Sequence, residues 1–442
     1  FASVLFLWLM GNALKNNAQT QEPISANATE LFNLAAAKHK RELSDLRGTR
    51  GLPLIYLPNA SAESIAKVLR AKDTDRDFSR EATYQEKTAV LFYSYEQASL
   101  QIWLVDEQGI QAYHRREILP ERIDELAINL RSAMRVDFLQ VTRSPQQRSI
   151  QTAVPISGNS QIPPNQAIAE LTEVLLPKNV ADKLASVRHL IIVPVLGLGT
   201  IPYPMLQPFN DQSFLIDKMS IAIAPSLFDV GAYVTPWNAK AAFSSPLIIG
   251  NPYLPKNPDW IVPPLPGAES EVNEVAKLIN TIPFIGKIAT KDLVVSKAPN
   301  SSLLYFATHG IASSNNPLTG GFLMLSAQQL EQGWWTAKEV QEMKLQLAEI
   351  AVLSACQTGL GKNHDAGVIG LARAFQIAGV PRVVISLWSV DDRATSYLMK
   401  AFMQNLQNDM PAEALRKAML EARKQHPDPA KWASFVLFGT PR

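Results

Sequence analysis

The sequence has little cysteine, no block of like charge and no long apolar run. One cysteine in 442 residues cannot form an intrachain disulfide, and it excludes a cysteine-rich zinc site. The 42 basic and 40 acidic residues nearly balance, which argues against a nucleic-acid partner. The apolar stretch over residues 1–14 is shorter than the roughly 20 residues that a membrane-spanning helix needs. A hydrophobic content of 47% at this length predicts a globular protein of about two domains.

Residues 1–20 have two interpretations. The apolar run and the polar residues after it are typical of an export signal, which would be cleaved near Ala18 and would take the protein to the periplasm. The alternative is an amphipathic helix buried at a domain edge, in a cytoplasmic protein. No repeat of fixed period follows, so we expect no tetratricopeptide-type array.

The rest of the chain divides into three segments by pattern. Residues 21–86 favour helices, and residues 87–243 begin with strands. From residue 244 to 442, short apolar runs alternate with helical patterns. We expect strands at 89–94, 100–105, 189–194, 214–224, 246–250, 282–285, 303–307, 350–354, 382–387 and 435–438, and helices at 120–134, 167–175, 268–278, 291–296, 368–378, 395–406 and 411–424.

Strands that are apolar throughout and alternate with helices indicate a mainly parallel sheet with helices on both faces, an α/β fold. Ligands of such sheets bind beyond the carboxyl ends of the strands. Four polar residues fall at those ends in this sequence: Asn251, His309, Cys356 and Asp391.

Cys356 and His309 form a candidate catalytic pair. Each follows a predicted buried strand, and they are 47 positions apart. An imidazole within hydrogen-bond reach can take the proton of a thiol, and the backbone N–H groups of Gly310 and Cys356 could hold an oxyanion. The competing interpretation is an inert buried cysteine. His364 is a weaker candidate base because its surroundings predict an exposed loop.

The residues around this pair resemble a known family. Residues 306–310 (FATHG) and 353–359 (LSACQTG) resemble the His and Cys motifs of CHAT-domain peptidases, relatives of caspases, separases and gingipains. Further matches are residues 265–269 (LPGAE), 335–339 (WTAKE), 370–375 (GLARAF), 386–392 (SLWSVDD) and 432–435 (WASF).

This resemblance implies a caspase-hemoglobinase fold, with a degenerate caspase-like lobe over residues 87–243 and a catalytic lobe over 244–442. It implies His309 as general base, Cys356 as nucleophile, and no metal or cofactor. The family is often found with tetratricopeptide repeats. Without them, recruitment or activation would use a separate protein partner or the N-terminal segment.

Substrate preference would depend on the S1 pocket, which holds the P1 side chain before the cleaved bond. Some relatives that prefer basic P1 residues carry an acidic residue two positions before the Cys, where this chain has Ser354. Asp391 and Asp392 are the next candidates, although one of them could instead cap the helix that begins near Ala394. The sequence thus predicts a cysteine endopeptidase acting on proteins or peptides. The alternatives are a silent scaffold or signalling module and a cysteine hydrolase of non-peptide acyl groups.

Overall fold

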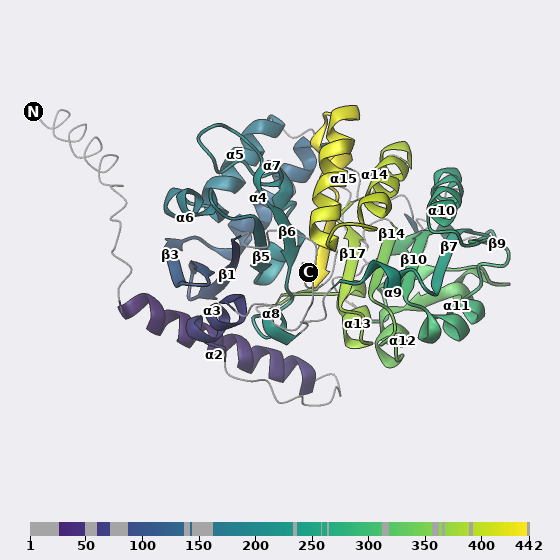
Figure 1. Cartoon of the computed structure of the whole chain (residues 1–442), viewed down its shortest axis with the longest axis horizontal. Coiled ribbons are helices and arrows are strands. Elements are labelled where there is room, and N and C mark those ends of the chain that lie inside the picture. Colours follow the sequence, from purple (N-terminus) through teal and green to yellow (C-terminus); the bar gives the residue numbers. More distant parts are fainter. Residues whose placement is uncertain are drawn as a thin grey trace, which may run out of the picture.

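The computed structural model describes most of the chain (Figure 1). The described residues are 26–48, 60–70, 87–136, 142–143, 162–232, 237–257, 259–262, 265–311, 318–355, 362–364, 367–388 and 392–439. Residues 1–20, with the predicted export signal, lie outside them, as does Cys356. Within the described ranges, no helix is long and apolar enough to cross a membrane.

One mixed sheet of eleven strands runs through the molecule, in the order β3-β2-β1-β5-β6-β18-β17-β14-β10-β7-β9. The first half contributes β1 (Thr88–Glu96), β2 (Ser99–Asp106), β3 (Gly109–Glu117), β5 (His189–Val193) and β6 (Ser220–Ile223). The second half contributes β7 (Pro246–Pro252), β9 (Phe284–Gly286), β10 (Leu303–Thr308), β14 (Ile350–Ala355), β17 (Arg382–Ser386) and β18 (Phe435–Gly439).

Strand direction reverses where the two halves meet. Strands β9, β7, β10, β14 and β17 are parallel to one another. Strand β18 is antiparallel to β17 but parallel to β6, which in turn is parallel to β5. The parallel strands of the two halves therefore run in opposite directions, and β18 joins them.

Helices cover both faces of the sheet, as expected from its apolar strands (Figure 1). One face carries α4 (Pro120–Ala133), α5 (Pro164–Leu175), α7 (Leu215–Lys218), α10 (Pro266–Leu278), α14 (Asp392–Asn405) and α15 (Pro411–Gln425). The other carries α2 (Ala26–Gly48), α3 (Ala62–Arg70), α8 (Asp229–Ala232), α11 (Lys291–Lys297), α12 (Ala337–Glu342) and α13 (Leu371–Ile377). The mainly parallel α/β architecture is thus confirmed.

Smaller elements complete the fold. They are α6 (Lys178–Leu184), α9 (Ala239–Ala242), α16 (Pro429–Trp432), the pair β4 (Thr142–Arg143) and β8 (Trp260–Ile261), the three-stranded sheet β11 (Gly310–Ile311), β12 (Phe322–Met324) and β13 (Trp334–Thr336), and the hairpin β15 (Lys362–His364) and β16 (Gly367–Ile369). Short 3-10 turns span Leu196–Thr200, Tyr203–Met205, Ala298–Asn300 and Leu330–Gly333.

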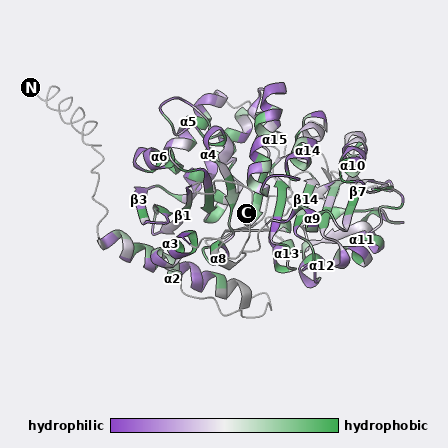
Figure 2. Cartoon of the chain, viewed as in Figure 1, coloured by the Kyte–Doolittle hydropathy of each residue, from purple (hydrophilic) through white to green (hydrophobic). Residues whose placement is uncertain are grey.

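The helices of the second half pack closely against the sheet. The sheet strands are coloured mostly as hydrophobic in Figure 2, whereas the helices carry both colours. Phe306 on β10 lies 5.5 Å, centroid to centroid, from the ring of Trp335. A Cβ on Gly250 of β7 would lie 2.3 Å from a Val272 methyl group, so only glycine lets α10 come this close to the sheet. That approach brings the residues beside Val272 against the sheet.

Two departures from the sequence expectations lie in the first half of the chain. Strand β3 was not predicted because most of its residues are only part-buried at the sheet edge and its last residues are charged. The single strand predicted over residues 214–224 is wrong. Its first part forms the helical turn α7, where Leu215 and Ile216 are buried by tertiary packing, and the strand β6 begins only at Ser220.

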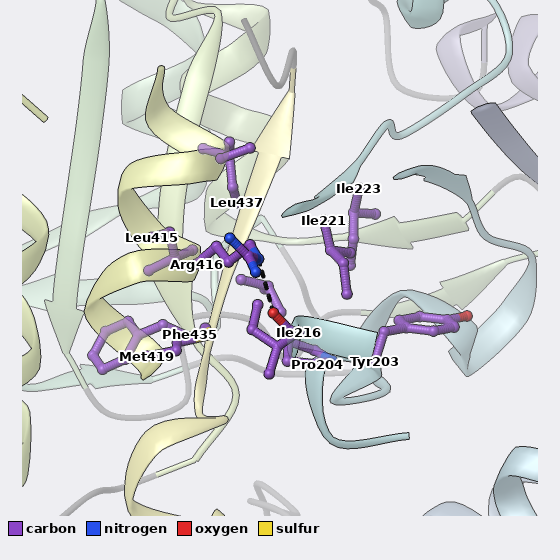
Figure 3. A pocket seen from close by; sticks show the side chains of 12 residues that line it. Tyr203, Pro204, Ile216, Ile221, Ile223, Leu415, Arg416, Met419, Phe435 and Leu437 are labelled. Carbon is purple, nitrogen blue, oxygen red and sulfur yellow. Dashed lines mark hydrogen bonds between the residues drawn. The ribbon is translucent and has the colours of Figure 1, made fainter. Parts of the chain in front are cut away.

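A small cavity of about 10 Å³ lies where the two halves meet (Figure 3). Its walls are mainly apolar and come from β6, β18 and α15. Arg416 crosses it and donates from Nε to the carbonyl of Ile216 at 2.8 Å. A space of this size barely holds one water molecule, so it is a gap in packing rather than a ligand site.

Candidate active site

The register of two neighbouring strands brings the predicted catalytic pair together. Thr308, the last residue of β10, is paired with Ala355, the last residue of β14. Paired residues of parallel strands lie about 4.8 Å apart. His309 and Cys356 therefore follow directly from adjacent positions at one end of the sheet. Cys356 itself lies outside the described residues.

His309 is held by the small sheet beside the strand end. Its side chain is buried, with an exposed fraction of 1%. Its carbonyl accepts a hydrogen bond from the N–H of Met324 at 2.9 Å, and the hydroxyl of Thr308 donates to the Met324 carbonyl at 2.6 Å. Two bonds to one residue of β12 fix the backbone on either side of the imidazole.

The same ladder orients the amide of Gly310. Gly310 lies opposite Leu323 in the antiparallel pair of β11 and β12. Since Met324 donates to the carbonyl of His309, Gly310 and Leu323 form a non-hydrogen-bonded pair. The N–H of Gly310 consequently points away from β12.

A cavity of about 40 Å³ opens at the carboxyl ends of β10, β14 and β17. It is lined by Thr308, Ser354, Ala355, Ser386 and Trp388, with the first turns of α10 on the opposite side. The Ser386 hydroxyl donates to the carbonyl of Ala355. The buried Trp388 donates from Nε1 to the carbonyl of Ala430 at 2.8 Å, which fixes the indole as a wall.

Glu271 on α10 brings a carboxylate to this cavity. Its exposed fraction is 3%, and its Oε1 accepts a hydrogen bond from the hydroxyl of Tyr305 at 2.6 Å. Burial raises the pKa of Tyr305 well above its usual value, and the neighbouring Glu271 charge raises that pKa further. The facing hydroxyl of Ser354 acts on the Tyr305 pKa in the opposite direction. Tyr305 therefore stays a neutral donor to the carboxylate.

The structure places the other predicted site residues as follows. Ser354 lines the cavity, and its assignment to an S1 pocket stays a prediction. Asp391 lies outside the described residues, and Asp392 is the first residue of α14, with a side chain that is likewise not described. Asn251 lies near the carboxyl end of β7, and its Nδ2 donates a hydrogen bond to Glu269 Oε2 at 3.1 Å. His364 lies in the hairpin strand β15, not in a loop.

Sequence reasoning missed Glu271, although a signal was present. Glu271 precedes Val275 by four positions and adjoins Val272, so it falls on the buried stripe of α10. An acidic residue on an apolar stripe is rare unless it is paired, which makes it a candidate for function. Among the described residues, no group of three His, Cys, Asp or Glu side chains is placed to hold a metal ion.

Comparison with known proteins identifies relatives that match this chain over only a small part of their own length. The chain is 28% identical over 296 residues to human tetratricopeptide repeat protein 28, and 26% identical to its mouse counterpart. Each match covers 57% of this chain but only 12% of the relative, so the chain spans about an eighth of the length of these proteins.

Solved structures give loose matches. The Arg-specific cysteine proteinase gingipain R matches with a TM-score of 0.40 and 10% identity, over 62% of this chain and 67% of that one. Separase from the Saccharomyces cerevisiae separase–securin complex matches with a TM-score of 0.48 and 12% identity, over 80% of this chain and 30% of that one. Similarity at this level does not bear on function.

The family model for the CHAT domain matches residues 165–440. The match spans β5 and β6 of the first half and every strand of the second half. This protein therefore belongs to the CHAT domain family.

Proposed function

We propose that this protein is a cysteine endopeptidase in which Cys356 is the nucleophile and His309 the general base. The pairing of Thr308 with Ala355 carries the proposal. His309 and Cys356 are the next residues after this pair, so both follow neighbouring strand ends that line a cavity. Membership of the CHAT domain family and the His and Cys motifs support it. The substrate would be a protein or peptide chain.

The proposed reaction has two steps. The Cys356 sulfur attacks the peptide carbonyl carbon, and His309 passes the thiol proton to the departing amine as the C–N bond breaks. Water then attacks the thioester, gives a proton to His309, and releases the carboxylic acid while the thiol is restored. In each step the Gly310 N–H, which points away from β12, would donate to the oxyanion with the N–H of Cys356.

The test compares wild type with Cys356→Ala on a fluorogenic peptide library in which P1 is varied. We expect turnover by the wild type and none above background by the variant. Iodoacetamide labelling of the wild type against pH should show a thiol that reacts well below the ordinary pKa of about 8.5.

A matched variant separates chemistry from folding. His309→Gln should lose turnover while keeping the far-ultraviolet circular dichroism of the wild type. Turnover that survives Cys356→Ala would contradict the proposal. So would a wild-type thiol that titrates near 8.5 together with no turnover of any peptide, a result that favours a non-catalytic scaffold.

A further inference from the structure

We propose that Glu271 is the residue that selects a basic side chain, lysine or arginine, at P1 of the substrate. The inference rests on the proposed peptidase function and names the group that would recognise its substrate. It assigns the acidic residue of the S1 pocket to α10, and not to Asp391 or Asp392 beyond β17.

Position is the first argument. The cavity that Glu271 lines is also lined by Thr308 and Ala355, the residues directly before His309 and Cys356. A P1 side chain must enter next to the nucleophile, because P1 carries the carbonyl that is attacked. The cavity meets this requirement, and Glu271 faces it from α10.

Charge is the second argument. Among the described residues that line the cavity, Glu271 alone carries an ionisable side chain of the acidic or basic kind. Glu271 is 3% exposed, and water screens a buried charge less than a surface charge, so a buried carboxylate attracts a cation more strongly. Tyr305, which donates to Oε1 at 2.6 Å, fixes the carboxylate in place.

The shape of the cavity is the third argument. Its volume of about 40 Å³ corresponds to roughly three water molecules, which is the space that the last atoms of a lysine or arginine side chain need. The hydroxyls of Ser354 and Ser386 supply polar contacts near the floor, and the Trp388 indole supplies an apolar wall for the methylene groups. A cation with an apolar stem fits this combination.

The first test measures kcat/KM for peptides that differ only at P1, with wild type, Glu271→Gln and Glu274→Gln. Glutamine keeps an oxygen for the Tyr305 hydroxyl but removes the charge. We expect Glu271→Gln to lose about a hundredfold for P1 Lys and Arg and to keep its rate for P1 Met. Glu274, one turn along on the surface and paired with Lys400, is the matched control and should change nothing.

A double variant that moves the carboxylate to another residue distinguishes a lost charge from a misfolded protein. Adding Ser354→Asp to Glu271→Gln places a carboxylate on another wall of the same cavity. We expect this double variant to recover at least tenfold for P1 Lys or Arg. An unchanged P1 profile in Glu271→Gln would overturn the inference and leave the peptidase proposal standing.

The second test does not need turnover. Binding of n-butylguanidine to Cys356→Ala protein is followed by ligand-observed NMR, with n-butanol as the neutral probe. We expect the guanidine to bind and the alcohol not to, and Glu271→Gln on this background to weaken binding at least tenfold. If this site binds the cation while the wild type cleaves no peptide, the cation pocket stands and the peptidase proposal fails. Binding that ignores Glu271→Gln would overturn the inference.

Discussion

Two buried tyrosines, one in each half of the sheet, show how the halves differ. Tyr93 on β1 donates to the backbone carbonyl of Leu175 at 2.8 Å. Tyr305 on β10 donates to the carboxylate of Glu271 at 2.6 Å. Burial raises the pKa of both phenols above the usual value. The first half thus satisfies a buried hydroxyl with the backbone, whereas the second half uses a charge.

That difference has an energetic meaning. A backbone carbonyl at a helix end needs a donor in any fold, so stability is enough to explain the Tyr93 bond. A buried carboxylate is expensive to desolvate, and replacing it with an apolar group is often neutral or stabilising. If Glu271 recognises the substrate as proposed, the second half gives up stability for that role, and the first half makes no such sacrifice at Tyr93.

The largest expected effect comes from comparing one histidine in each half. His309→Ala should lower kcat/KM by about a thousandfold or more, since general base and nucleophile act as a unit. His189, which begins β5 and lies with Nδ1 2.7 Å from the Ser220 hydroxyl, serves as the counterpart. His189→Ala should leave kcat/KM within twofold and cost about 1 kcal/mol of unfolding free energy. Equal losses of activity in the two variants would end the functional distinction between the halves.

The next effect is a pH dependence that belongs to the first half. His39 on α2 packs on Phe92 and Phe228, and burial lowers its pKa from 6.5 to about 4. The folded protein therefore favours neutral imidazole. The His39 contribution is fully present above pH 6.5 and is lost as the pH falls toward 4, because the unfolded state binds the proton first.

Urea unfolding at pH 7.5 and pH 5.0 measures this contribution. Between these values the wild type should lose about 2 kcal/mol that His39→Phe does not lose, given about 1.4 kcal/mol per unit of pKa shift. Other groups titrate in both proteins and cancel in the difference. Parallel losses in wild type and variant would mean that His39 is not buried as a neutral group.

The smallest effects come from removing the two tyrosine hydroxyls. Tyr93→Phe should cost about 1 kcal/mol of unfolding free energy, because it removes the hydrogen bond to the Leu175 carbonyl, and should leave the P1 profile unchanged. Tyr305→Phe removes a donor from Glu271, so cleavage after P1 Lys should fall about tenfold. Chemical denaturation and kcat/KM, measured on both variants, check the contrast. An altered P1 profile in Tyr93→Phe would contradict the contrast between the two tyrosines.

The second-half strands could be predicted from sequence because their cause is local. Strands β10, β14 and β17 each contain an apolar run of about the length of the strand, so their limits were predicted to within one residue. Strand β3 could not be recognised in this way, since its polar residues are set by its place at the sheet edge. The turn α7 was mistaken for strand because its apolar residues face a core that only the tertiary structure supplies.

The candidate site divides in the same manner. The position of His309 after a buried strand was visible in the sequence, and the register with β14 agrees with its proposed role. Glu271 was not recognised, because its proximity to the strand ends depends on how closely α10 packs over Gly250. A contact between a helix face and a distant strand end cannot be read from spacing alone.

Strand β18 also has a consequence for biosynthesis. It pairs with β6, and α15 next to it bonds Ile216 through Arg416, 200 residues later in the chain. While a ribosome is still making those last elements, β6 presents an open edge, and such edges recruit other chains into aggregates. The edge of β6 in the nascent chain must therefore avoid pairing with other chains for many seconds, until β18 is made and covers it.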